Sequence, residues 1–349
     1  MLNPSYAFIS ACLKGEEPRT VTTEHIDKMK AASSLEDALA IIRETDVGSY
    51  LEEATLRTFD DLDEHLWRYL AQRIRFVESF RFLPRDVLKI SSAYVVKYDL
   101  LNIKAVLQHL SGAQRTSMIP IGVVHNNELL EELSNAEDVD AIIQILIRCK
   151  MGDYVPILEE YKTDKSSKSR FVAETRMDGE YYKSMVNMAR RIKDGMVLTK
   201  ALGLVIDLTN LEIVSRAVVQ GIGSDAAESI IAGGYRITDK ALKELLPLKI
   251  TDMSARLDDT QYQEIANEVS TNYDKTKDIT TVDEILDKHK FRLLRDMLSP
   301  RVLSPLVMAW YLILKEVEIR NLRLVLKTII DGVPVQEIEN YLVMWHDVR

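Results

Sequence analysis

The feature that most constrains the fold of this chain is a phrase of about 15 residues that occurs three times. The copies read DLLNIKAVLQHLSG (99–112), DLTNLEIVSRAVVQG (207–221) and EIRNLRLVLKTIIDG (318–332). Each copy has one asparagine at the equivalent place, namely Asn102, Asn210 and Asn321, so the copies lie 108 and 111 residues apart. A fixed period of this length indicates repeated structural units. The 349 residues therefore divide into three repeats of about 110 residues each, a common size for a domain.

The three copies share more than the asparagine. An acid stands three residues earlier, at Asp99, Asp207 and Glu318. A glycine closes each copy, at Gly112, Gly221 and Gly332. Apolar residues recur between them at spacings of three and four, which predicts an amphipathic helix. Glycine adopts the left-handed conformation past a helix end at little cost, so we expect each of these signature helices to end at its glycine.

A second shared segment precedes each signature helix. It reads LDEHLWRYL (62–70), MDGEYYKSM (177–185) and LDKHKFRLL (286–294). An acid is followed four residues later by an aromatic residue and then by a base, as in Asp63, Trp67 and Arg68. The simplest interpretation of these acids and bases is exposure to solvent or pairing within their own repeat.

The whole chain is predicted to be helical. Helical spacing of apolar residues runs through 24–56, 58–82, 86–111, 127–148, 172–220, 238–268, 281–297 and 304–330. Segments rich in glycine and serine, 111–122 and 222–236, are predicted to link the repeats. The expected fold is all-α, with three similar helical domains at residues 1–122, 123–234 and 235–349.

Composition narrows the class of protein. Hydrophobic residues make up 46% and charged residues 28% of the chain, which allows a sizeable core. The longest apolar run, 302–314, is too short for a membrane span, and no secretory signal is expected. Two cysteines favour a reducing compartment. The formal net charge of −9 disfavours nucleic acid as a partner. The sequence also lacks the GxxxxGK[ST] motif of a phosphate-binding loop, so nothing in it indicates nucleotide binding.

The repeated polar positions have two interpretations. Asn102, Asn210 and Asn321 could be buried amides that tie helices together within each repeat, because a satisfied polar group fixes one packing arrangement. Alternatively, they and the acids Asp99, Asp207 and Glu318 could face a shared space in which a partner binds. The structural interpretation is the simpler one for both sets.

Two Asp-x-His pairs, at Asp63 with His65 and at Asp287 with His289, raise the question of a metal site. Residues two apart on a helix face different directions, and the middle repeat has Glu180 in place of the histidine. We therefore expect no metal, no cofactor and no catalytic residue.

Several of these phrases resemble one protein family. The segments 97–107 and, more strongly, 311–343 look like the C subunit of the archaeal and bacterial A-type (V-type) rotary ATPases, which is similar to the d subunit of the eukaryotic V-ATPase. Residues 177–182 and 33–42 add support, and the resemblance covers essentially the whole chain. The start departs from the family pattern, because AFISACLKG follows Tyr6 where the family usually has a basic stretch.

The resemblance implies a funnel of three all-α domains around a pseudo-threefold axis. It implies a non-catalytic rotor subunit on the cytoplasmic side of the membrane, peripheral to it. Its partners would be the central-stalk subunits of D and F type and the membrane rotor ring, with membrane association only through that ring. The role would be torque transmission for ATP synthesis or for ATP-driven proton or sodium transport. The alternatives from the residues alone are a free-standing helical-repeat scaffold and an enzyme that uses the Asp/His pairs.

Overall fold

The computed structural model describes residues 4–56, 58–80, 82–257 and 260–344, and every regular element in these ranges is a helix. This confirms the all-α prediction. The chain forms two compact units. The terminal compact unit joins both ends of the chain, residues 1–91, 119–121 and 298–349. The central compact unit comprises residues 92–118 and 122–297. The division into three repeats stays a prediction about the sequence.

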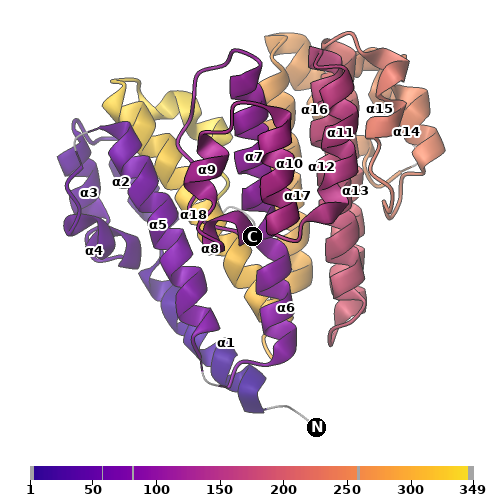
Figure 1. The fold of residues 1–349 in the computed structure, drawn as a ribbon. Helices are drawn as coiled ribbons and strands as arrows, with labels where there is room; N and C mark the ends of the chain where they lie inside the picture. The colour runs from indigo at the N-terminus through magenta and orange to yellow at the C-terminus, as the bar shows by residue number, and fades with distance from the viewer. Residues whose placement is uncertain (1–3, 57, 81, 258–259, 345–349) are drawn as a thin grey trace. The chain divides into compact units, whose positions relative to one another are not determined.

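The terminal compact unit contains two long helices, α5 and α18, and several short ones (Figure 1). Its α-helices are α1 (Pro4–Glu16), α2 (Thr23–Met29), α3 (Leu35–Ile41), α4 (Asp46–Glu52), α5 (Phe59–Glu78), the first part of α6 (Arg85–Tyr94) and α18 (Leu306–Ile330). Two 3-10 helices, η1 (Glu17–Arg19) and η4 (Val335–Tyr341), complete it.

Helices α5 and α18 pack side by side along their lengths. Phe59 of α5 lies beside Lys327 of α18, and Tyr69 of α5 lies beside Lys315, so the two helices run antiparallel. Helix α5 begins at a capping box, in which the Thr58 hydroxyl and the Asp61 carboxylate bind each other's backbone N–H. Its apolar residues bury one face of the helix against the unit.

The central compact unit contains three long helices, α12, α13 and α17 (Figure 1). Its α-helices are α7 (Val96–Leu110), α8 (Val123–Asn126), α9 (Leu130–Ser134), α10 (Val139–Arg148), α11 (Val155–Thr163), α12 (Ser167–Ala189), α13 (Gly195–Val219), α14 (Asp239–Leu245), α15 (Ile250–Arg256), α16 (Gln263–Thr276) and α17 (Ile279–Leu298). The 3-10 helices are η2 (Gly152–Tyr154) and η3 (Gly223–Ser229). Helix α13 is apolar on nearly all sides, which is typical of a helix buried at the centre of a unit.

Several predicted helical ranges are wrong in extent. The range 127–148 is divided between α9 and α10, and 238–268 is divided among α14, α15 and the first part of α16. The range 172–220 is interrupted between α12 and α13, where Asp194 takes a left-handed φ of 58°. The range 24–56 is three short helices, because Ser34 and Thr45 each cap a new helix with their side chains. Apolar spacing continues across these turns, so the helical period alone does not reveal them.

The ends of the signature helices α7, α13 and α18 are confirmed. Gly112, Gly221 and Gly332 have φ of 98°, 69° and 69° and follow the last helical residue at the same position. Each closes a Schellman motif, in which the glycine N–H and the next N–H bind carbonyls of the last turn, as Ile222 does with Ala217 at 2.9 Å. The three copies of the phrase are therefore structurally equivalent at their ends.

Candidate functional site

The three repeated asparagines are buried on their signature helices, with exposures of 1%, 0% and 7% in chain order. Asn210 donates from Nδ2 to the carbonyl of Ile231 at 2.8 Å, and the Ile231 N–H donates back to Oδ1 at 2.8 Å. Asn321 makes the same pair of bonds with Val343, at 2.8 and 3.1 Å. Each of these two amides thus satisfies both polar groups of a residue about twenty positions further on. This geometry favours the structural interpretation of the asparagines.

The three repeated acids contact the first segment of the next repeat. Asp99 accepts backbone N–H bonds from Val123 at 2.7 Å and Val124 at 2.9 Å, at the start of α8. Asp207 accepts three, from residues 235–237 just before α14, at 3.2, 2.8 and 3.3 Å. The hydroxyl of Tyr262 donates to the same Asp207 carboxylate at 2.7 Å. We call these bonds the acid contacts.

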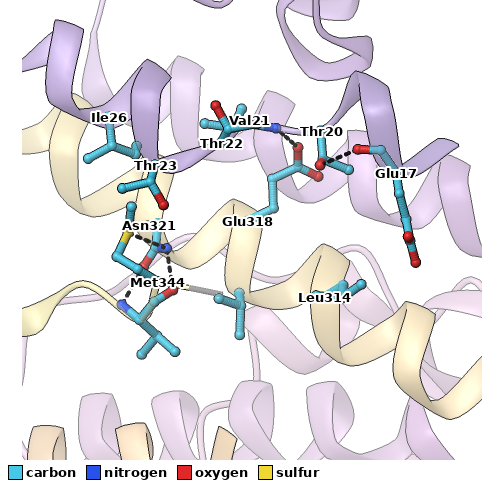
Figure 2. A pocket seen from close by; sticks show the side chains of 12 residues that line it. Glu17, Thr20, Val21, Thr22, Thr23, Ile26, Leu314, Glu318, Asn321 and Met344 are labelled. Carbon is cyan, nitrogen blue, oxygen red and sulfur yellow. Dashed lines mark hydrogen bonds between the residues drawn. The ribbon is translucent and has the colours of Figure 1, made fainter. Parts of the chain in front are cut away.

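The acid contact of the third copy closes the series. Glu318 accepts the backbone N–H of Val21 at 2.7 Å, and Val21 lies just before α2 near the beginning of the chain (Figure 2). The acid of the third copy therefore binds the beginning of the first repeat, just as the acid of the first copy binds the beginning of the second repeat. Glu318 also accepts a bond at 3.0 Å from Lys315, whose side chain is buried, and Lys315 donates to the Tyr69 hydroxyl at 3.4 Å.

Glycines make room for two of the acid contacts. A Cβ on Gly122 would lie 2.4 Å from Oδ1 of Asp99, and a Cβ on Gly234 would lie 2.2 Å from Oδ1 of Asp207. Both distances are far inside van der Waals contact, so only glycine lets these carboxylates reach the following N–H groups. The third copy has Thr20 before Val21 and an acid longer by one methylene, which accepts the Val21 N–H at 2.7 Å.

Burial dominates the electrostatics of the first two acids. It raises the pKa of Asp99 to about 6 against the opposing effect of its two backbone donors. Burial also raises the pKa of Asp207, although Tyr262 and three backbone N–H groups favour the carboxylate. Both acids thus hold segments of the chain in place while their charged form is disfavoured by burial.

A third set of contacts was missed by the sequence analysis. The residue two positions after each asparagine pairs with the segment that precedes the signature helix of the next repeat. Lys104 binds Asp178 at 2.5 Å, Glu212 binds Lys290 at 2.7 Å, and Arg323 binds Asp63. We call these the charge contacts.

We expected the acids Asp63 and Asp178 to be solvated or paired within their own repeats, and this expectation is wrong. Asp178 pairs with a base of the first repeat, and Asp63 pairs with a base of the third. The bases fit that expectation, because Arg68 pairs with Glu64 on its own helix and Lys183 pairs with Glu180. At the second contact the signs are exchanged. Burial alone would lower the pKa of Lys290, but Glu212 and Asp287 outweigh it and raise that pKa.

Figure 2 shows a small cavity beside the third acid contact, lined by Glu318, Asn321 and the segment from Glu17 to Thr23 among others. Its volume is about 40 Å³, enough for one or two waters. Ligand pockets are usually several hundred Å³, so this site suits no organic ligand. A larger open hollow of about 510 Å³ is lined by three bases, Arg176, Lys183 and Arg190, and by acids from η2, α12 and η3.

Neither Asp/His pair is part of a group of side chains arranged as a metal site among the described residues. The His65 ring lies 6.3 Å from the Tyr50 ring, and His289 Nε2 lies 2.8 Å from a carboxylate oxygen of Glu268. Within the described ranges, no group of three His, Cys, Asp or Glu side chains is arranged to hold a metal ion. Among the same residues, no helix is both long and apolar enough to cross a membrane.

Comparison with known proteins finds one family and several similar proteins. The sequence model of the ATP synthase (C/AC39) subunit family matches residues 9–341. Similar proteins include the A-type ATP synthase C subunit of Methanocaldococcus jannaschii, 24% identical over 97% of this chain and 86% of the relative. Those of Thermococcus kodakarensis and Methanococcoides burtonii are 22% and 25% identical over 97% of this chain, and cover 90% and 94% of the relatives. The match spans all three copies of the signature phrase, and the chain belongs to the ATP synthase (C/AC39) subunit family.

Proposed function

We propose that this chain is a non-catalytic rotor subunit of an A/V-type ATP synthase, which links the central shaft to the membrane ring and transmits torque between them. The observation that carries the proposal is the family match over residues 9–341, with relatives named as the C subunit of A-type ATP synthases. The partners would be stalk subunits of D and F type and the ion-carrying ring, on the cytoplasmic side of the membrane. The transported ion would be a proton or sodium.

The cyclic order of the contacts supports this role. Asp99, Asp207 and Glu318 each bind the beginning of the next repeat, and the last binds the beginning of the first. The charge contacts have the same order. Three equivalent junctions are what a pseudo-threefold arrangement of three helical domains requires, and we propose that arrangement, as a funnel, for this chain.

Torque transmission needs a body that does not shear under load. Buried, fully hydrogen-bonded polar contacts have one preferred geometry, and close-packed helices between them transmit strain with little compression. The acid contacts place such bonds at each junction between repeats, with exposures of 0% for Asp99 and Asp207 and 7% for Glu318. A non-catalytic role fits these residues, because each has a binding partner within the protein itself.

Two assays test the proposal. The purified chain should hydrolyse no ATP above the buffer rate, with or without magnesium. A complex assembled without the chain should keep hydrolysis by its catalytic head but lose ATP-driven ion transport, since the shaft would no longer drive the ring. Normal transport without the chain would refute the torque role. A free-standing scaffold would then be the better interpretation, particularly if the chain fails to bind isolated stalk subunits.

A further inference from the structure

An exposed aromatic cluster lies at one end of the terminal compact unit. Phe8, Phe76 and Phe82 are 54%, 43% and 80% exposed. The Phe80 ring lies between the first two, with centroids 5.8 Å from Phe8 and 5.1 Å from Phe76. Four of the seven phenylalanines of the chain are therefore gathered here. Such grouped exposure of large apolar rings marks an interaction surface, whereas single exposed apolar residues are ordinary.

Basic residues flank three of these rings in the sequence. Residues 73–89 contain five arginines and lysines and two acids, in a chain whose formal net charge is −9. Both acids have partners, because Glu78 accepts a bond from Ser91 at 2.5 Å and Asp86 pairs with Lys89 at 3.1 Å. Arg75 and Arg85 are exposed. We call Phe8, Phe76, Phe80, Phe82, Arg75 and Arg85 the aromatic–basic patch.

The segment before α18 extends this chemistry. Because α18 runs antiparallel to α5, its first turn lies at the end of the pair where α5 finishes. Tyr311 near that end donates to Glu16 of α1 at 2.7 Å. Just before α18, Arg301 is exposed and Val302 is 38% exposed. The same end of this unit thus gains one more base and one more apolar side chain.

The central compact unit has a turn of the same kind, at the equivalent place between α12 and its signature helix α13. Met196 is 88% exposed, the highest exposure of any large apolar side chain among the described residues. The segment 190–200 contains four bases, Arg190, Arg191, Lys193 and Lys200, and a single acid, Asp194. The combination of an exposed apolar tip and flanking bases therefore recurs in two repeats that differ in sequence.

We infer that the aromatic–basic patch of the terminal compact unit contacts an anionic lipid surface directly. Aromatic rings are favoured at the boundary between headgroups and acyl chains, and arginine and lysine are attracted by anionic headgroups. Opposite charge is needed locally, because an acidic protein is otherwise repelled by an anionic bilayer. Membrane association then does not depend on the ring alone. The inference rests on these residues, independently of the proposed torque role.

Flotation of the purified full chain with lipid vesicles tests the inference. Binding is expected to vesicles of phosphatidylcholine mixed with phosphatidylglycerol and not to phosphatidylcholine alone, and high salt should weaken it. Phe76→Ser/Phe82→Ser and Arg75→Glu/Arg85→Glu should each lower the bound fraction at least about fivefold. The matched control is Leu101→Ser/Ile147→Ser, at apolar side chains 45% and 52% exposed elsewhere, which should bind like the wild type. Circular dichroism and thermal unfolding confirm that each variant is folded.

The outcomes separate lipid from protein as the partner. Equal binding to both kinds of vesicle, or unchanged binding by both patch variants, would overturn the inference. Absence of vesicle binding, with loss of binding to the detergent-purified ring in the patch variants, would also overturn it and would assign the patch to a protein contact. Since vesicle binding is measured on the isolated chain, its failure leaves the proposed rotor function intact.

Discussion

Replacing Gly234 with alanine tests the acid contacts most directly. The new Cβ would lie 2.2 Å from Oδ1 of Asp207 and 3.2 Å from the carbonyl oxygen of Ile237. Gly234 has a backbone conformation outside the left-handed region, so alanine adds no backbone strain of its own. The carboxylate would have to move by roughly 1 Å to reach ordinary contact distance. The substitution therefore acts on one buried group.

The magnitude follows from the bonds that this movement breaks. Asp207 is 0% exposed and accepts four hydrogen bonds of 2.7–3.3 Å. A shift of that size takes the longer ones beyond hydrogen-bond distance and leaves buried N–H groups without an acceptor. Each such loss costs about 1–3 kcal/mol, so we expect Gly234→Ala to destabilise the protein by about 3 kcal/mol.

Urea unfolding, together with hydrogen exchange at residues 235–237, measures the effect. The control is Gly179→Ala within α12, where the nearest atom to the new Cβ, on Ile231, is 3.9 Å away. That variant should be stabilised by about 0.5–1 kcal/mol, as expected for alanine in a helix interior. In an Asp207→Ala background, Gly234→Ala should cost less than about 1 kcal/mol, because the collision is gone. Stability of Gly234→Ala within about 0.5 kcal/mol of wild type, or unchanged exchange at 235–237, would refute the reasoning.

Two further predictions concern the signature helices. Asn210→Leu should destabilise the protein by about 2–4 kcal/mol in urea unfolding, because both backbone polar groups of Ile231 lose their partners. The control is Asn267→Leu at an exposed position, which should change stability by less than about 0.5 kcal/mol. An unchanged Asn210→Leu that binds stalk subunits more weakly would instead favour the partner-facing interpretation. Burial raises the pKa of Asp99 to about 6, above its unfolded value, so its contribution to stability is complete below about pH 4 and is lost as the pH rises through 6. A rise of about two pKa units corresponds to about 3 kcal/mol of stability. The free energy of unfolding, measured between pH 5 and 7.5, should therefore fall more for the wild type than for Asp99→Asn. An equal fall with pH in both proteins would contradict the raised pKa of Asp99.

The sequence predicts the helices well because their signals are local. Spacings of three and four, and the glycines that end each copy of the phrase, involve neighbours within one or two turns. The breaks within 24–56, 127–148, 172–220 and 238–268 were missed. Turns such as those at Thr45 and Asp194 keep the apolar spacing and are decided by single residues. Burial of the asparagines follows from the pattern, because a repeated polar residue beside an apolar stripe needs a partner.

The partners of the repeated acids could not be predicted in the same way. Asp99 and Asp207 bind backbone N–H groups, which every residue except proline has and which leave no mark in the side-chain sequence. The only available signal was the glycine before each set of donors, at Gly122 and Gly234 in the segments predicted to link the repeats. The charge contacts were obscured for another reason, since Glu212 and Lys290 exchange the signs found at the other two junctions.

The junction formed by Glu318 differs from the other two in how the chain reaches it. Asp99 and Asp207 bind donors 24–30 residues ahead, whereas Glu318 binds Val21, 297 residues behind it. Closing a loop about ten times longer costs about 2 kcal/mol more in chain entropy. This junction also has a single backbone donor, so other interactions must offset both deficits.

The terminal compact unit supplies those interactions around α18. Buried Lys315 pairs with Glu318, and the Arg323 guanidinium binds Asp63 while lying 4.7 Å from the centre of the Trp67 ring. The Arg323–Asp63 pair has counterparts at the other two junctions, but the cation over the aromatic ring contributes about 0.5–2 kcal/mol more, and the Lys315–Glu318 pair adds to it. Longer side chains with more charge thus replace the short aspartate and glycine of the other junctions. This explains why the third copy of the phrase departs from the first two at its acid, where glutamate stands for aspartate, while its asparagine and its final glycine are unchanged.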